Sequence, residues 1–243
     1  MSSISESGHV KNLAHFKNII NFCQGYGATY NPSTESIKLP NLLLLLKAGE
    51  DAHADCIKKQ TLFDNASDTR RMNFAGLIPK ATRVVNALIA SGAEENTIKS
   101  ARSVMNKLLG KRSGKLNDNP DPGQPIPENI SVSQRSIDKQ LEHLAALLEI
   151  IQSIPSYQPN ESELQTASLL AYQTQLVEAN QAVMQTYTDW SNSCIVRYNT
   201  MYVPKIGFSA TSRLIKTYVK SVYGASSQQF KQLSAYQFTK PAK

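Results

Sequence analysis

The sequence predicts an all-α protein, an elongated helical bundle built from a tandem duplication of a unit with one very long helix and shorter companion helices. Three observations lead to this prediction: an internal repeat, a proline-rich segment between its copies, and apolar residues spaced by three or four over long stretches free of Gly and Pro. With 243 residues, 41% of them hydrophobic, the chain can bury a sizeable core.

The repeat is visible as matched residues at an offset that drifts from 128 to 126 and then to 132. Residues 15–24 (HFKNIINFCQ) match residues 143–152 (HLAALLEIIQ), with the histidine, the glutamine and every strong apolar position in register. Further matches pair Tyr30-Asn31-Pro32 with Tyr157-Gln158-Pro159, Arg71 and Asn73 with Arg197 and Asn199, and Arg83-Val84-Val85 with Arg213-Leu214-Ile215. We interpret these matches as a duplication of about 100 residues.

The copies are separated by a segment that cannot be helical. Four prolines fall between Pro120 and Pro127 in a polar context, which predicts an extended linker. The predicted organisation is therefore a first helical repeat over 1–110, a linker over 111–132 and a second repeat over 133–243. We expect the repeats to pack together as one bundle about a pseudo-twofold axis; two separate bundles joined by the linker are the alternative.

The helices follow from apolar spacing and from start and stop residues. In the second copy we expect helices over 133–152, from Ser162 as N-cap to just before Pro204, over 207–223 with Gly224 as C-cap, and over 226–238. In the first copy the corresponding long helix is expected over 36–73, followed by helices over 77–91 and 95–109. Each long helix must bury its apolar stripe against partners of comparable length.

Composition excludes several classes of protein. Three widely spaced cysteines, Cys23, Cys56 and Cys194, form neither a disulfide framework nor a metal-binding pair, and we expect buried thiols in a reducing compartment. Residues 1–10 lack the features of a signal peptide, and the longest apolar run, 42–46, is far shorter than a membrane span. We therefore expect a cytoplasmic protein without a transmembrane segment.

Catalytic and metal-binding patterns are weak. Glu50 and His53 have the spacing of a di-iron helix motif, but the second copy lacks the matching histidine, and the other such pair, Glu6 with His9, is expected in an unstructured N-terminus. The matching histidines His15 and His143 are interpreted as helix-face residues. No nucleophile or phosphate-loop motif occurs, so we expect no enzyme, no metal and no cofactor.

Charge is strongly segregated along the chain. The formal net charge is −1 over residues 1–69, +8 over 70–115, −8 over 116–189 and +8 over 190–243. The last block also holds half of the aromatic residues, which suggests a polyanion site that combines phosphate attraction with base stacking. Its candidate residues are Arg213, Lys216, Lys220 and Lys231. The simpler interpretation is that most of these aromatics face the core and that the acidic half of the second copy packs against its basic half.

The segment 216–231 (KTYVKSVYGASSQQFK), together with Tyr157–Glu161, resembles uncharacterised two-copy helical proteins of Bacteroidota-type bacteria. The resemblance implies a bacterial origin and brings no activity or binding residue with it. The leading hypothesis is a non-enzymatic structural or interaction protein that uses complementary charged surfaces to contact a protein partner or a second copy of itself. The alternatives are nucleic-acid or polyanion binding through the basic C-terminal segment, and an α-helical membrane-active or pore-forming protein.

Overall fold

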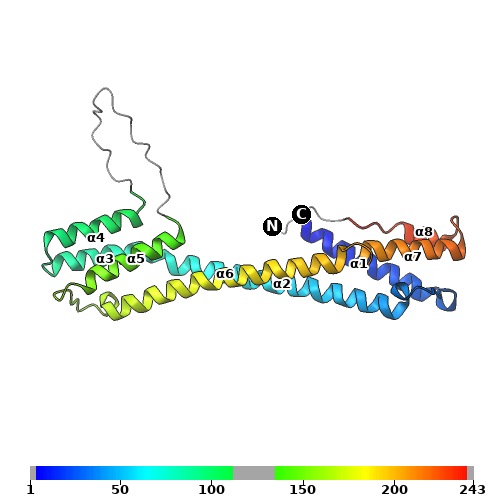
Figure 1. Ribbon diagram of the computed structural model, residues 1–243, viewed down its shortest axis with the longest axis horizontal. Helices are drawn as coiled ribbons and strands as arrows, with labels where there is room; N and C mark the ends of the chain where they lie inside the picture. Colours follow the sequence, from blue (N-terminus) through cyan, green and yellow to red (C-terminus); the bar gives the residue numbers. More distant parts are fainter. Residues whose placement is uncertain (1–3, 112–134, 240–243) are drawn as a thin grey trace, which may run out of the picture. The chain divides into compact units, whose positions relative to one another are not determined.

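The computed structural model describes residues 4–111 and 135–239, in which the chain forms eight α-helices and three 3-10 turns and no strand. The first half contains α1 (Ile4–Gly25), the turns Gly27–Thr29 and Glu35–Ile37, α2 (Leu39–Ala75), α3 (Leu77–Ala90) and α4 (Glu95–Leu108). The second half contains α5 (Ile137–Gln152), the turn Ser162–Leu164, α6 (Thr166–Tyr202), α7 (Phe208–Tyr223) and α8 (Gln228–Ser234) (Figure 1). The predicted all-α class is confirmed.

Several predicted helix boundaries are wrong by a few residues. Ser162 opens a 3-10 turn instead of capping the long helix, which begins at Thr166. The N-cap of α5 is Ser136, whose hydroxyl accepts a hydrogen bond from the Lys139 backbone N–H at 3.3 Å. Gly224 ends α7 with a φ of 88°, as expected for a C-terminal glycine. The predicted linker, 111–132, lies outside the described residues except for Lys111.

The N-terminus is helical, so the expectation of an unstructured segment around His9 is wrong. α1 begins at Ile4, and His9 is only 5% exposed on this helix. The apolar spacing becomes regular only after Val10, so periodicity alone did not indicate the start of this helix.

The two long helices both have 37 residues but end differently. Only Gly76 separates α2 from α3, so residues 39–90 form one bent helix of 52 residues. Between α6 and α7 the chain leaves the helix over 203–207, where Lys205 has a φ of 76°. Pro204 lies in this break and cannot donate a backbone hydrogen bond to continue the helix.

The chain divides into two compact units that each draw on both halves of the sequence. Unit 1 comprises residues 1–63 and 186–243, and unit 2 comprises residues 64–185, so both boundaries fall within the long helices. Unit 1 therefore contains α1, α7, α8, the first part of α2 and the last part of α6. Unit 2 contains α3, α4, α5, the last part of α2 and the first part of α6.

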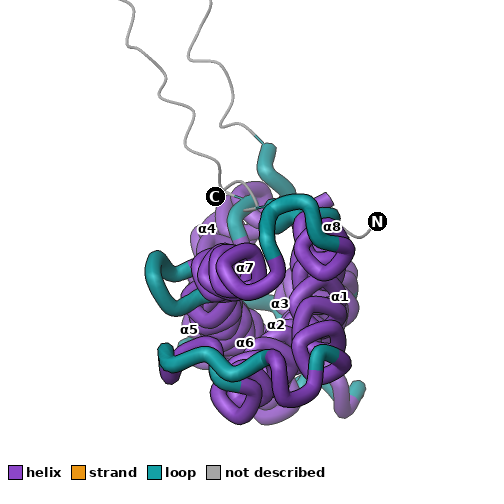
Figure 2. Tube along the Cα trace, turned by 90° about the vertical axis from the view of Figure 1, so that its right-hand side faces the viewer, coloured by secondary structure: helices purple, strands orange, loops and turns teal. Residues whose placement is uncertain are grey.

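Within each unit the same pairs of elements are in contact. In unit 1, α7 packs against α1, α8 and the turn 35–37, and α1 contacts α8 (Figure 2). In unit 2, α3 packs against α5, α4 and the turn 162–164, and α5 contacts α4. A buried tyrosine closes the loop before each long helix: the Tyr30 hydroxyl donates to the Ile37 carbonyl at 2.7 Å, and that of Tyr157 to the Leu164 carbonyl at 2.9 Å.

Each unit has its own hydrophobic core. The core of unit 1 is rich in aromatic residues and includes the stacked rings of Phe16 and Phe208, whose centroids are 4.3 Å apart. That of unit 2 is mainly aliphatic and includes Leu77 and Leu176. The buried positions of α3 lie 131 before those of α7: Leu77, Ala81, Val84 and Leu88 against Phe208, Ser212, Ile215 and Val219. The sequence match, which paired Arg83 with Arg213, is therefore shifted by one residue from the correspondence in burial.

Candidate functional site

The two units differ most in net charge. Unit 1 contains 14 Lys and Arg against 6 Asp and Glu, a formal charge of +8, whereas unit 2 contains 12 against 13, a charge of −1. The basic block 70–115 thus shares unit 2 with nearly all of the acidic block 116–189. Arg83 of α3, for example, pairs with Glu163 at 2.7 Å, and this guanidinium lowers the pKa of the Glu163 carboxyl.

The predicted match between the acidic block 116–189 and the basic block 190–243 is therefore not found within one unit, because the acidic block shares unit 2 with the basic block 70–115. The basic block 190–243 belongs to unit 1, where it meets residues 1–63 in place of the acidic block. The prediction assumed that the blocks 116–189 and 190–243 would pack on each other. However, α6 carries the chain from unit 2 into unit 1 before the charge changes sign.

The four predicted polyanion-binding residues lie on α7 and α8 of unit 1. Arg213, Lys220 and Lys231 are exposed, and the Lys220 ammonium lies 5.8 Å from the ring centroid of Phe230 on α8, next to Lys231. Lys216 is half-buried, and its ammonium donates a hydrogen bond to the Tyr236 carbonyl. Burial lowers the pKa of Lys216. Three of the four residues therefore present charge to solvent, and the fourth is used inside the unit.

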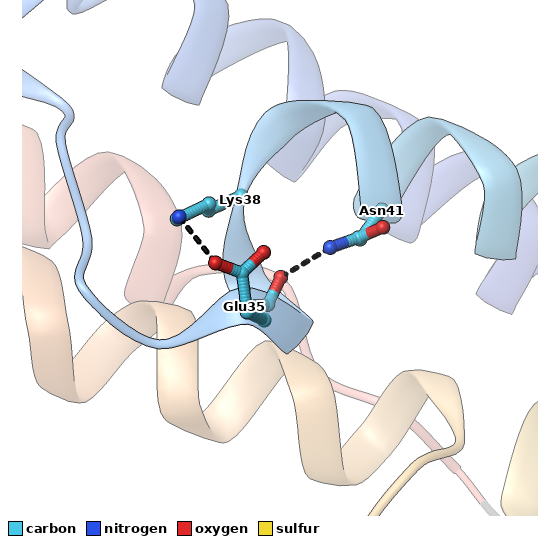
Figure 3. A network of polar contacts seen from close by, with 3 residues as sticks. All are labelled: Glu35, Lys38 and Asn41. Carbon is cyan, nitrogen blue, oxygen red and sulfur yellow. Dashed lines mark hydrogen bonds and ion pairs between the residues drawn. The ribbon is translucent and has the colours of Figure 1, made fainter.

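Three other lysines of unit 1 are already paired with carboxylates. At the start of α2, Lys38 pairs with Glu35, whose backbone carbonyl accepts a hydrogen bond from the Asn41 side chain at 2.7 Å (Figure 3). Lys47 and Lys59 pair with acidic residues one helical turn away. Within the described residues, the exposed cations of α7 and α8 have no such carboxylate partner, which leaves their charge available.

The aromatic residues of the C-terminal block mostly pack inside unit 1. Those that join or flank its core are Tyr198, Tyr202, Phe208, Tyr218, Tyr223, Phe230, Tyr236 and Phe238. The ring of Tyr218, for example, lies 5.3 Å from that of Tyr30 at a near-right angle. Tyr202 and Phe208 are buried, and the other rings are half-buried against the core, so these aromatics contribute to packing within unit 1.

A buried polar cluster, made of His9, Asn12, His53, Arg197 and Tyr202, connects α1, α2 and α6 in unit 1. The Tyr202 hydroxyl lies 2.9 Å from His9 Nδ1 and accepts a hydrogen bond from Asn12 Nδ2 at 2.8 Å. Arg197, only 4% exposed, donates to His53 Nδ1 across 3.4 Å. The cluster thus satisfies polar groups at a helix junction.

The corresponding contact in unit 2 involves Arg70 and not Arg71, which the sequence match had paired with Arg197. The long helices begin at 39 and 166, an offset of 127 that places Arg70 opposite Arg197 and Asn180 opposite His53. Arg70 donates to Asn180 Oδ1 at 3.0 Å, and Asn180 donates to an oxygen of Asp138 at 3.1 Å. Arg71 instead forms an exposed ion pair with Asp68.

The metal motif considered from the sequence does not assemble into a ligand set. His53 faces Arg197, whereas Glu50 is exposed on α2. Among the residues that the structure describes, no group of three or more His, Cys, Asp and Glu side chains is arranged to hold a metal ion. His15 and His143 also differ: His15 Nδ1 lies 2.8 Å from the Gln237 carbonyl, while His143 is buried.

Sequence reasoning missed a pair of cysteines. Cys56 on α2 and Cys194 on α6, 138 residues apart, have their sulfur atoms at 2.8 Å from each other within unit 1. Cys56 is fully buried as expected, but Cys194 is only half-buried. No spacing rule relates two cysteines on different long helices, so the sequence carried no signal for this contact.

Unit 2 has a hollow of about 510 Å³ between α3 and the segment 156–161. Polar side chains such as Asn86 and Gln158 line it beside Ala87. At the offset of 131, Ala87 corresponds to Tyr218 in unit 1, whose hydroxyl accepts a hydrogen bond from the Asn31 backbone N–H at 3.0 Å. The smaller residue explains why unit 2 has a hollow where unit 1 has a packed ring.

Comparison with known proteins adds no relative from which a site could be transferred. No family model, curated protein or solved structure matches the chain. Within the described ranges, none of the helices is both long and apolar enough to cross a membrane.

Proposed function

We propose that this chain is a non-enzymatic interaction protein whose unit 1 binds an acidic, partly apolar surface of a protein partner. The observation that carries the proposal is the division of charge: the net charge of the chain resides in unit 1, at +8, while unit 2 is close to neutral. Complementary charge accelerates encounter and selects among partners.

Exposed apolar residues support a protein partner. Of the 14 large hydrophobic residues exposed within the described ranges, 11 belong to unit 1. On α7 they alternate with the cations: Leu214, 44% exposed, follows Arg213, and Val222, 45% exposed, lies two residues after Lys220. Protein interfaces combine an apolar centre with a polar rim and are enriched in arginine.

Nucleic-acid binding is the second candidate, and only the exposed cations favour it. Stacking on aromatic rings normally contributes about 1–3 kcal/mol per base in single-strand binders. Most rings of this block pack in or against the core of unit 1, and the Lys216 ammonium donates a hydrogen bond to the Tyr236 carbonyl. The exposed cations therefore still favour electrostatic binding to phosphates, whereas the packed rings do not favour base stacking.

The proposal is tested by titrating the protein with labelled probes of equal charge: an acidic peptide containing leucines, an acidic peptide without them, and single-stranded DNA. We expect the leucine-containing peptide to bind most tightly and its affinity to fall with added salt. Replacing Arg213, Lys220 and Lys231 by Glu should weaken binding at least about tenfold, which corresponds to about 1.4 kcal/mol.

A matched control separates a local surface from total charge. Arg102, Lys107 and Lys111 of unit 2 are also exposed, and their replacement by Glu changes the net charge equally. This control should bind the peptide within about threefold of the parent, because its substituted residues lie outside unit 1. A threefold change corresponds to a binding free energy of under about 1 kcal/mol. Equal losses in both variants would contradict a site on unit 1, and tighter binding of DNA than of either peptide would favour the second candidate.

We also propose that the two halves descend from one duplicated helical unit. Both halves have four α-helices in the same order, long helices of equal length and the same pairs of contacts within the compact units. Self-association is the other form of the interaction hypothesis, in which the protein partner is a second copy of this chain. Light scattering after size-exclusion chromatography at low and high salt tests it, and a monomer under all conditions would exclude it.

A further inference from the structure

We propose that Cys56 and Cys194 form an oxidation site, at which two thiols become a disulfide that links the two halves of the chain within unit 1. The sulfur atoms are 2.8 Å apart, one on α2 and one on α6. The inference is independent of the proposed partner binding, since it concerns a contact between two helices and not the exposed surface.

The separation of the two sulfur atoms is close to that of a bond. A disulfide has an S–S length of about 2.05 Å, so the atoms need to approach by only about 0.8 Å. The pair is absent from unit 2, where Val183 and Ser67 occupy the corresponding positions at the offset of 127. The two units share their architecture without it, so the contact is a specific feature of unit 1.

Access to the pair is asymmetric. Cys56 is fully buried, while Cys194 is half-buried and reachable by a small oxidant. The guanidinium of Arg197 donates a hydrogen bond to Cys194 Sγ across 3.9 Å, and a cationic donor stabilises the thiolate that reacts. Cys194 is therefore the residue oxidised first, and Cys56 is the resolving thiol.

The oxidant we name is a small peroxide, such as hydrogen peroxide. The Cys194 thiolate attacks one peroxide oxygen, the O–O bond breaks, and a sulfenic acid and one water form. The Cys56 sulfur then attacks Cys194 Sγ, the S–O bond breaks, and the second water leaves as the S–S bond forms. In sum, two thiols are oxidised by two electrons, and one peroxide is reduced to two waters.

Cys23 serves as an internal control. It lies in the core of unit 1, and burial raises the pKa of the Cys23 thiol to about 12. A thiol with so high a pKa has little thiolate at neutral pH and reacts slowly. Oxidation should therefore spare Cys23.

The test treats the folded chain with limiting hydrogen peroxide, blocks the remaining thiols, and maps peptides by mass spectrometry without reduction. We expect one intramolecular link between Cys56 and Cys194 and a free thiol at Cys23. The melting temperature should rise by at least about 5 °C, because the link closes a very long loop, and return after reduction.

Two variants make the result decisive. Cys23→Ser should form the link as the parent does, whereas Cys194→Ser should form no intramolecular link and show no reversible rise in melting temperature. The proposal is overturned if the folded parent gives links between chains, links to Cys23, or sulfinic acid at Cys194 with no cystine.

Discussion

Units 1 and 2 have the same internal plan but are filled with different residues. Each combines the first helix of one half with the third and fourth helices of the other, in the same set of contacts. Unit 1 then carries the net charge, most of the exposed apolar residues and the cysteine pair, whereas unit 2 pairs its charges internally. The shared contacts maintain the architecture, so the functional candidates are found where the two units differ.

The two units also differ in how single side chains pack. Gly49 of α2 faces the ring of Phe208, and a Cβ added at Gly49 would overlap that ring. The corresponding residues in unit 2 are Leu176 and Leu77, both buried in its core. A small and a large residue in one unit thus replace two of medium size in the other, which conserves volume.

The largest expected effect comes from dividing the chain between residues 111 and 135. Because each unit contains elements of both halves, neither fragment carries the residues of a complete core. Fragments 1–111 and 135–243 produced together should co-purify when one is tagged, and the complex should show the helical circular dichroism of the whole chain. A single fragment that unfolds cooperatively as a monomer would contradict this division.

The sequence predicted the helices and their class because apolar spacing reports directly which face of a segment is buried. It could not predict that α7 packs on α1, since an apolar stripe does not identify its partner. A match of residue types also cannot fix the register: Arg71 matched Arg197, but burial and the contact with Asn180 select Arg70. The contact of Cys56 with Cys194 depends on how two long helices are aligned, which no local pattern encodes.

The second-largest effect on stability is expected when the packing of one unit is exchanged for that of the other. Gly49→Leu should destabilise the protein by about 3 kcal/mol, because the new side chain collides with Phe208 in a filled core. Phe208→Leu alone should cost about 1–3 kcal/mol through the lost ring and its stacking on Phe16. Urea unfolding measures both changes.

The double variant decides whether the two sites are complementary. Gly49→Leu combined with Phe208→Leu reproduces the Leu176 and Leu77 pair of unit 2, and it should be less destabilised than the sum of the single changes by about 1–3 kcal/mol. Additive losses would show that the correspondence between the units does not extend to this contact.

The smallest expected effect concerns the matched histidines His15 and His143. Burial lowers the pKa of His143, against the favourable charge of Glu142 and with the unfavourable charges of Lys107 and Lys139. The unfolded chain then binds a proton at a higher pH than the folded chain, so stability should fall as the pH drops below the ordinary histidine pKa of about 6.5. His143→Gln should flatten this part of the dependence of the urea midpoint on pH, measured from about pH 7.5 to about pH 5.5 around that same value. His15→Gln in unit 1 is the matched control. If His143→Gln leaves the profile unchanged, or if His15→Gln flattens it as much, the burial of His143 is not the cause of this pH dependence.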